Sequence, residues 1–266
     1  GEPQSAKEFA CLAQWVNYDG HRSLFESRSQ NRKGLLMWMS HSCWPSMVWQ
    51  TYDYYFEPTA AYFAIKKASE PLHIQWNPAT DEVEVVNYSA GTHKGLTAKV
   101  QVLNMDASVA WEKEATVDSN EDTTDKCIKL EFPENLSKVH FIKMTLVEDG
   151  KVISDNFYHR SLEENNYQDL QKLPKVALQS ATTVDKNADG TWSAVSVIEN
   201  KTSTPALMIR LNVVGGKDGQ QILPVFYSDN YFSLLPGEKK EVRMNWKDED
   251  ARGNEGKVVI SGYNVE

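Results

Sequence analysis

The hydrophobic pattern of this chain changes period at Pro71, and that change constrains the fold more than any other feature. Before Pro71, apolar residues recur at helical spacing around one short apolar run. After it, apolar and polar residues alternate in short segments separated by turn signals, which is typical of antiparallel sheets. The 266 residues are enough for two or three domains. The sequence therefore predicts an α/β segment followed by all-β domains.

Two helices and one strand are predicted in residues 1–70. Residues 5–29 have apolar side chains at i, i+3, i+4 and i+7 and open with the capping box Ser5 and Glu8. Residues 34–39 are almost wholly apolar, which favours a strand buried on both faces of a parallel sheet. A second helix is predicted over 59–68. This is too little to close an α/β fold, so residues 1–70 are expected to be part of a larger domain.

The rest of the chain divides into two β series joined by a polar linker at 162–174. The first series, 71–161, contains the candidate strands 72–76, 82–88, 96–104, 126–132, 140–148 and 152–158. The second series, 175–266, contains the candidate strands 176–183, 192–199, 206–214, 221–227, 239–245 and 257–263. Asp149-Gly150 predicts a hairpin turn. Two β-sandwiches follow from this spacing.

Composition excludes several classes of partner and site. The formal net charge of −9 argues against nucleic acid, whose phosphates such a surface repels. No apolar run approaches the roughly 18 residues of a membrane span. The three cysteines, Cys11, Cys43 and Cys127, form neither a disulfide framework nor a zinc pattern, and buried free thiols are expected. Residues 185–190 open like an EF-hand loop, but Ser196 stands where its last ligand should be, so a hairpin turn is predicted.

Aromatic residues are concentrated between positions 44 and 63, where eight occur. Buried aromatics commonly hold domains together, and we expect roughly six of the eight to have that role. Four of them, Tyr54, Tyr55, Tyr62 and Phe63, are expected to pack residues 1–70 on the first sandwich. Aromatic faces also bind the C–H faces of sugars. Trp38 and Trp44 suit this second role, because they lie at and just after the carboxyl end of the predicted strand, which is the active-site end in (β/α)₈ barrels.

Residues 38–55, WMSHSCWPSMVWQTYDYY, resemble the last barrel strand and following loop of glycoside hydrolase family 2, in its exo-β-D-glucosaminidase and β-mannosidase branch. The resemblance continues through 61–75, which is similar to the final barrel helix and its exit. It returns in 167–170 and 227–238, which are similar to the terminal immunoglobulin-like domain. One difference is that the family usually has Asn where His41 stands.

The resemblance implies a multi-domain fold: a remnant of a (β/α)₈ TIM barrel in 1–70, then two immunoglobulin-like sandwiches. It implies a retaining exo-β-glycosidase acting on glucosaminides or mannosides, with Trp38, His41 and Trp44 binding substrate. Both catalytic glutamates would lie upstream, so this chain is expected to be an inactive fragment with no catalytic residue, metal or cofactor of its own. Its partners would be a carbohydrate and the upstream portion of the same protein. The chain starts like the middle of a protein, and a periplasmic or secreted parent is expected.

Retaining chemistry needs two carboxyls about 5 Å apart across the glycosidic bond. The carboxylates of residues 1–70 offer no candidate for such a pair. They are Glu2, Glu8, Asp19, Glu26, Asp53, Glu57 and Glu70. Two other functions remain open. One is a non-catalytic carbohydrate-binding or adhesion module of two sandwiches, which would leave the apolar run at 34–39 without a purpose. The other is an independent enzyme with an unfamiliar site, for which the sequence offers no support.

Overall fold

The computed structural model describes residues 2–27, 34–47 and 49–266. They form two compact units. The first unit consists of His21–Leu36 and Ala64–Lys172, and the second of Glu2–Gly20, Met37–Phe63 and Leu173–Glu266. The helices α1 (Ala6–Ser27) and α2 (Ala60–Ala68) each contribute residues to both units. Each unit contains one β-sandwich, as the alternating pattern predicts.

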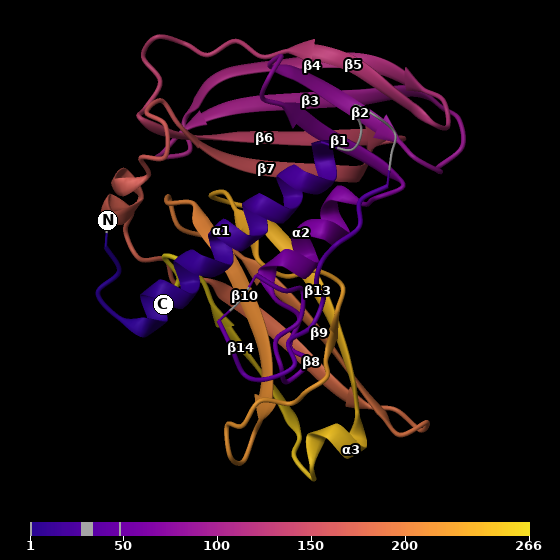
Figure 1. Ribbon diagram of the computed structural model, residues 1–266, viewed down its shortest axis with the longest axis vertical. Helices are drawn as coiled ribbons and strands as arrows, with labels where there is room; N and C mark the ends of the chain where they lie inside the picture. The colour runs from indigo at the N-terminus through magenta and orange to yellow at the C-terminus, as the bar shows by residue number, and fades with distance from the viewer. Residues whose placement is uncertain (1, 28–33, 48) are drawn as a thin grey trace. The chain divides into compact units, whose positions relative to one another are not determined.

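The first sandwich has a three-stranded sheet of order β1-β2-β5 and a four-stranded sheet of order β4-β3-β6-β7. Figure 1 shows β3, β4, β6 and β7 side by side as one sheet. All pairings are antiparallel. The strands are β1 (Leu72–Asn77), β2 (Glu82–Asn87), β3 (His93–Asn104), β4 (Val109–Ser119), β5 (Thr123–Lys129), β6 (Val139–Glu148) and β7 (Lys151–Ser161).

The core of the first sandwich comes from the inward side of both sheets. In β3, alternate residues from Leu96 to Val102 are fully buried, as a period of two dictates. They belong to one apolar cluster with Ile74 of β1 and Val83 of β2. Each such side chain contributes roughly 1.5–3 kcal/mol when it leaves water. The predicted hairpin turn joins β6 to β7, and Asp149 and Gly150 both have the positive φ that such a turn requires.

The second sandwich has a three-stranded sheet of order β12-β10-β14 and a four-stranded sheet of order β11-β13-β9-β8. Its core packs Leu207, Ile209 and Leu211 of one sheet with Ile198 and Met244 of the other, all fully buried. Its elements are β8 (Gln179–Lys186), β9 (Thr191–Glu199), β10 (Ala206–Gly215), β11 (Phe226–Tyr227), β12 (Phe232–Leu234), β13 (Lys239–Lys247), a short helix α3 (Asp248–Ala251) and β14 (Gly256–Ser261). A 3₁₀ turn, η2 (Gln168–Lys172), precedes this sandwich within the predicted linker. Residues 185–190 lead into the β8–β9 hairpin, as predicted.

The strand predicted over 34–39 is wrong. These residues have no regular structure, the side chain of Leu36 is fully exposed and Trp38 is 81% exposed. A strand needs at least one neighbouring strand to hydrogen-bond with, and the sheets of the described residues contain no strand that pairs with 34–39. Both helix predictions are confirmed over Ala6–Ser27 and Ala60–Ala68, while positions 28 and 29 lie outside the described residues. Within those residues, neither helix combines the length and the apolar character that crossing a membrane requires.

Two strands were missed by the sequence prediction. β4 carries charged residues at positions 112–114, which hide its alternation, and β12 has only three residues. The strand predicted over 221–227 is present only at its end, as β11, with Gln221 making an isolated bridge to Val214. The three cysteines are free, but they are not the buried thiols expected: Cys43 is exposed and the other two are half-buried.

Candidate functional site

The candidate site lies in a loop of the second unit, residues 38–58, which contains all three predicted substrate residues. The loop folds back on itself through an isolated bridge between His41 and Tyr52, with the Tyr52 amide donating to the Ser40 carbonyl at 3.0 Å. It closes where the Thr59 amide donates to the Thr51 carbonyl at 2.9 Å, one residue before α2 begins. Backbone pairing therefore holds the loop in place without help from a buried apolar strand.

The tryptophans of this loop face solvent. Trp38 is 81% exposed and Trp44 is 68% exposed, and Trp49 is 56% exposed. The indole N–H of Trp49 donates to the Trp38 carbonyl at 3.3 Å, which connects the two ends of the loop's aromatic stretch. Exposed tryptophans offer broad apolar faces to a ligand, and the exposure of these faces to water is energetically unfavourable.

His41 is oriented by two contacts within the same loop. Its ring stacks on Phe56, with centroids 4.5 Å apart and planes 13° from parallel. Its Nε2 lies 3.3 Å from the Tyr54 carbonyl oxygen, a position that favours the tautomer with the proton on Nε2. With that tautomer Nδ1 is a hydrogen-bond acceptor. The structure thus places Trp38, His41 and Trp44 in one ordered loop.

The expectation that most aromatics of 44–63 are buried is wrong. Five of the eight are exposed: Trp44, Trp49, Tyr54, Tyr55 and Phe56. The packing partner expected for Phe63 is also wrong, because its ring contacts Tyr227 and Tyr231 of the second sandwich, with centroid distances of 6.3 and 5.9 Å. The aromatic concentration is therefore mainly a surface feature, which a sequence count alone cannot distinguish from a core.

Several carboxylates of the first segment are engaged in structural bonds. Asp53 accepts the backbone amides of Tyr55 and Glu57 at 2.8 and 2.9 Å, which shapes the loop. Glu57 forms an ion pair with Arg210, which is 153 residues away in sequence. Sequence reasoning could not find that pair, since a lone acid and a lone base that far apart carry no shared signal.

A buried polar network in the first unit engages two more carboxylates. The imidazole of His73, fully buried, lies between Glu26 Oε1 at 3.1 Å and Glu70 Oε2 at 3.2 Å. Burial pushes the pKa of His73 down, but the hydrogen bonds to Glu26 and Glu70 prevail and the pKa is raised. Burial likewise pushes the pKa of Glu70 up, but the hydrogen bond to His73 and the charge of Lys67 hold it below its usual value.

The network extends to β7. The Asn156 amide donates to Glu26 Oε1 at 2.8 Å, and the Tyr158 hydroxyl donates to the same carboxylate. Arg22 donates to the Asn156 side-chain oxygen at 3.1 Å. A sequence signal existed: residues 154–158 and 228–232 are similar, and Asn156 and Asn230 are both buried and hydrogen-bonded. Because Glu26, Glu70 and His73 are paired with one another in the interior of the first unit, this network has the features of a structural one.

The described residues contain no group of three or more His, Cys, Asp or Glu side chains arranged to hold a metal ion. The loop itself presents exposed aromatic faces, one imidazole and backbone groups. Such a surface can bind and orient a polar ligand with apolar faces.

Two protein-family profiles match the chain, and together they cover residues 81–265, which include all of the second sandwich and the first sandwich from β2 onward. Residues 81–161 match the mannosidase Ig/CBM-like domain, and residues 156–265 match the exo-β-D-glucosaminidase Ig-fold domain. The exo-β-D-glucosaminidase of Streptomyces avermitilis is 30% identical over 296 residues, an alignment that covers 100% of this chain and 33% of that protein. The chain thus spans about a third of the length of the curated relatives it matches.

Solved structures are similar in fold. The exo-chitosanase of Amycolatopsis orientalis superposes with a TM-score of 0.88 at 29% identity, covering 95% of this chain and 33% of that one. The β-D-mannosidase of Dictyoglomus thermophilum has a TM-score of 0.69 at 18% identity, covering 95% of this chain and 29% of that one, and shares the fold alone. The resemblance expected from the sequence is confirmed.

Proposed function

We propose that this chain, which carries the immunoglobulin-like domains of the exo-β-D-glucosaminidase and mannosidase group of glycoside hydrolase family 2, is the C-terminal region of a longer retaining exo-β-glycosidase. Its coverage of about a third of each relative supports this reading, since the other two thirds would hold the catalytic glutamates. The chain by itself is inactive in this proposal.

Residues 1–70 are the end of a catalytic barrel in this proposal. The outward face of α1 supports it: Phe9, Val16 and Leu24 are 46%, 74% and 54% exposed. These positions recur at intervals of seven and eight residues, which puts them on one side of a helix. They form an apolar surface of the kind that proteins cover with another element. The rest of the barrel would cover it.

The exposed aromatic loop carries the functional assignment. Sugar rings present C–H faces that pack on aromatic rings, and their hydroxyls pair with polar groups at the rim. Trp38 and Trp44 supply the faces, and the acceptor Nδ1 of His41 supplies a polar group. In the proposed enzyme these three residues bind the sugar that is cleaved, while two glutamates outside this chain act as acid/base and nucleophile.

The substrate class is a β-linked glucosaminide, with mannosides second. Several of the relatives that align over the full chain are named exo-β-D-glucosaminidases, which favours the first. The alternative function is a non-catalytic carbohydrate-binding or adhesion module, and the exposed tryptophans also fit that use. The two functions differ in whether the full-length protein hydrolyses a glycosidic bond.

Hydrolysis by the full-length protein tests the proposal. Nitrophenyl β-D-glucosaminide, β-D-mannoside and β-D-galactoside are offered in parallel, and release from the glucosaminide is expected to be fastest. The variants Trp38→Ala and Trp44→Ala should each lower kcat/KM about tenfold or more, which corresponds to about 1.4 kcal/mol of transition-state binding. Phe226→Ala removes an aromatic that is 68% exposed on the second sandwich outside the loop, and it should leave kcat/KM unchanged. Absence of hydrolysis of all three substrates would favour the binding module.

A further inference from the structure

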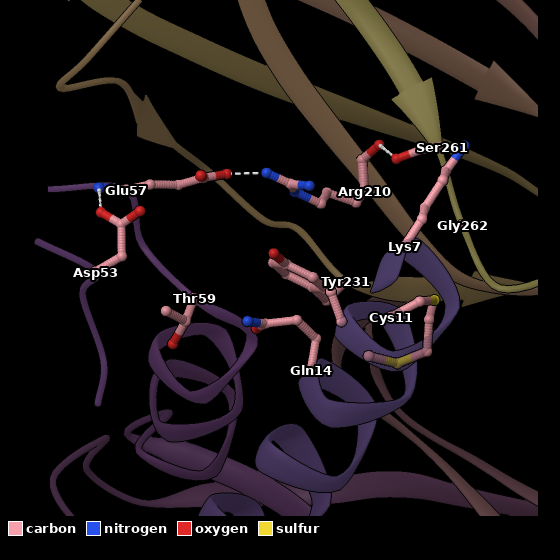
Figure 2. A pocket seen from close by; sticks show the side chains of 12 residues that line it. Lys7, Cys11, Gln14, Asp53, Glu57, Thr59, Arg210, Tyr231, Ser261 and Gly262 are labelled. Atoms are coloured by element: carbon pink, nitrogen blue, oxygen red, sulfur yellow. Dashed lines mark hydrogen bonds and ion pairs between the residues drawn. The ribbon is translucent and has the colours of Figure 1, made fainter. Parts of the chain in front are cut away.

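A second feature of the second unit is a cavity of about 320 Å³, bounded by α1, the last residues of the aromatic loop, β10 and the end of β14. Figure 2 shows the side chains that line it, with Gln14 and Cys11 on α1, Glu57 and Arg210 across one side, and Tyr231 between them. The volume is at the small end of the roughly 300–1,000 Å³ of ligand sites, which suits one sugar-sized ring.

The charges that line the cavity balance. Lys7 and Arg210 carry two positive charges, and Asp53 and Glu57 carry two negative ones. The Arg210–Glu57 ion pair, drawn as a dashed line in Figure 2, neutralises one charge of each sign. Asp53 uses Oδ1 on two backbone amides, which leaves Oδ2 as an acceptor beside the cavity. A free anion would meet two carboxylates here, and a free cation would meet two basic groups.

Two hydrogen-bond donors border this space. Gln14 accepts the Ala60 amide with Oε1 at 2.8 Å, so its NH₂ group is directed elsewhere, and Figure 2 shows the carboxamide reaching between Thr59 and Tyr231. The Tyr231 hydroxyl points into the same space, while its ring packs against Phe63. Both groups can donate to the oxygen of a ligand.

Mixed donors and acceptors with no net charge match a neutral polyhydroxylated ligand, because each hydroxyl can donate and accept. An apolar ligand would displace water from these polar groups without replacing the hydrogen bonds that the water makes. We propose that this cavity binds one neutral hexopyranose ring, at a site separate from the aromatic loop's Trp38 and Trp44. The choice of a sugar over another polyol rests on the proposed function; the cavity's polarity does not.

Alkylation of Cys11 tests the proposal because its thiol lines the cavity. The full-length protein is treated with iodoacetamide with and without methyl β-D-glucopyranoside, and each cysteine is quantified by peptide mass spectrometry. At ten times its dissociation constant, the glycoside should slow alkylation of Cys11 about tenfold. Cys127 of β5 in the first sandwich, half-buried like Cys11, is the internal control, and its rate should not change. Burial raises the pKa of the Cys11 thiol, so the reaction is run at mildly alkaline pH.

Two variants assign the protection to the cavity. Tyr231→Phe removes only the hydroxyl that points into the space and should abolish protection. Tyr227→Phe makes the same change on the same sandwich, where the hydroxyl accepts the Val213 amide, and should retain it. If Tyr231→Phe melts early, Gln14→Glu replaces the donor and keeps an acceptor for the Ala60 amide, and it should also abolish protection.

Charged probes give the results that would overturn the proposal. Phosphate and tetramethylammonium, which keeps its positive charge at this pH, should leave the Cys11 rate unchanged. Protection by either one but not by the neutral glycoside would replace a sugar site with an anion or cation site. Absence of protection by the glycoside in the native protein overturns it directly. Nitrophenyl glycoside hydrolysis is measured on the same preparation. Protection without hydrolysis would support the proposed sugar site in the cavity and contradict the proposed function. Hydrolysis without protection would support the proposed function and contradict the sugar site.

Discussion

Replacing Glu26 with Gln should destabilise the first unit by about 3 kcal/mol, at the low end of the roughly 3–5 kcal/mol that breaking a buried ion pair costs. The Glu26 carboxylate accepts hydrogen bonds from His73 at 3.1 Å, Asn156 at 2.8 Å and Tyr158 at 2.9 Å. All three donors are at least nine-tenths buried. A glutamine turns one acceptor oxygen into a donor NH₂ group, so at least one buried donor then faces another donor.

The pH dependence of this loss follows from the raised pKa of His73. Because the folded-state pKa lies above the unfolded one, the stabilisation is fully present below the ordinary histidine pKa of about 6.5. It is lost as the pH rises through the raised folded-state pKa. The difference between the wild type and Glu26→Gln should therefore be largest at mildly acidic pH and smaller at alkaline pH.

Urea unfolding followed by tryptophan fluorescence measures the loss, and hydrogen exchange of β1 and β7 peptides assigns it to the first unit. Glu131→Gln changes an exposed carboxylate on the same unit and should alter stability by no more than about 0.5 kcal/mol. A loss below about 1 kcal/mol for Glu26→Gln, or one that grows with pH, would refute the view that the charge of Glu26 holds His73.

Two further predictions concern the second unit, and thermal melting checks both. A Cβ added at Gly256 would lie 2.4 Å from Cζ2 of the buried Trp246, so Gly256→Ala should destabilise the protein by about 1–3 kcal/mol. The control is Gly20→Ala, on α1 with open space around it, which should instead stabilise the protein by up to about 1 kcal/mol. Equal effects of the two substitutions would contradict the packing argument. The buried Asn264 side chain bonds three backbone groups, so Asn264→Ala should cost about 1–3 kcal/mol, and a neutral result would mean that other groups satisfy that backbone.

Local patterns predicted the β portion of the fold because strand alternation and turn chemistry are local. The alternation of β3 and the Asp149-Gly150 turn each depend on a few neighbouring residues. The strand predicted over 34–39 was wrong because the pairing that a strand needs is not a local property. An apolar segment becomes a buried strand only if other strands pair with it, and that condition depends on residues elsewhere.

The polar assemblies were not predictable for a related reason. Glu26 and His73 are 47 residues apart and Glu57 and Arg210 are 153 apart, so nothing in either neighbourhood shows that the charges meet. Trp38 and Trp44 were selected for their position at the end of a predicted strand that the structure does not contain, and the family resemblance then added His41. Their use in substrate binding stays a prediction, while their placement in one loop is a property of the structure.

The exposure of that loop is specific to it, which argues that it has a purpose beyond folding. The protein has eight tryptophans, and the three with exposed side chains all lie between positions 38 and 49. Elsewhere the same chain buries tryptophan efficiently: Trp15 and Trp76 are 6% exposed and Trp246 is 2% exposed. General loose packing would scatter exposed tryptophans over both units, since every core would be affected alike. The confinement of exposed tryptophans to one loop held by backbone hydrogen bonds instead indicates a surface that another molecule, or another part of a longer chain, completes.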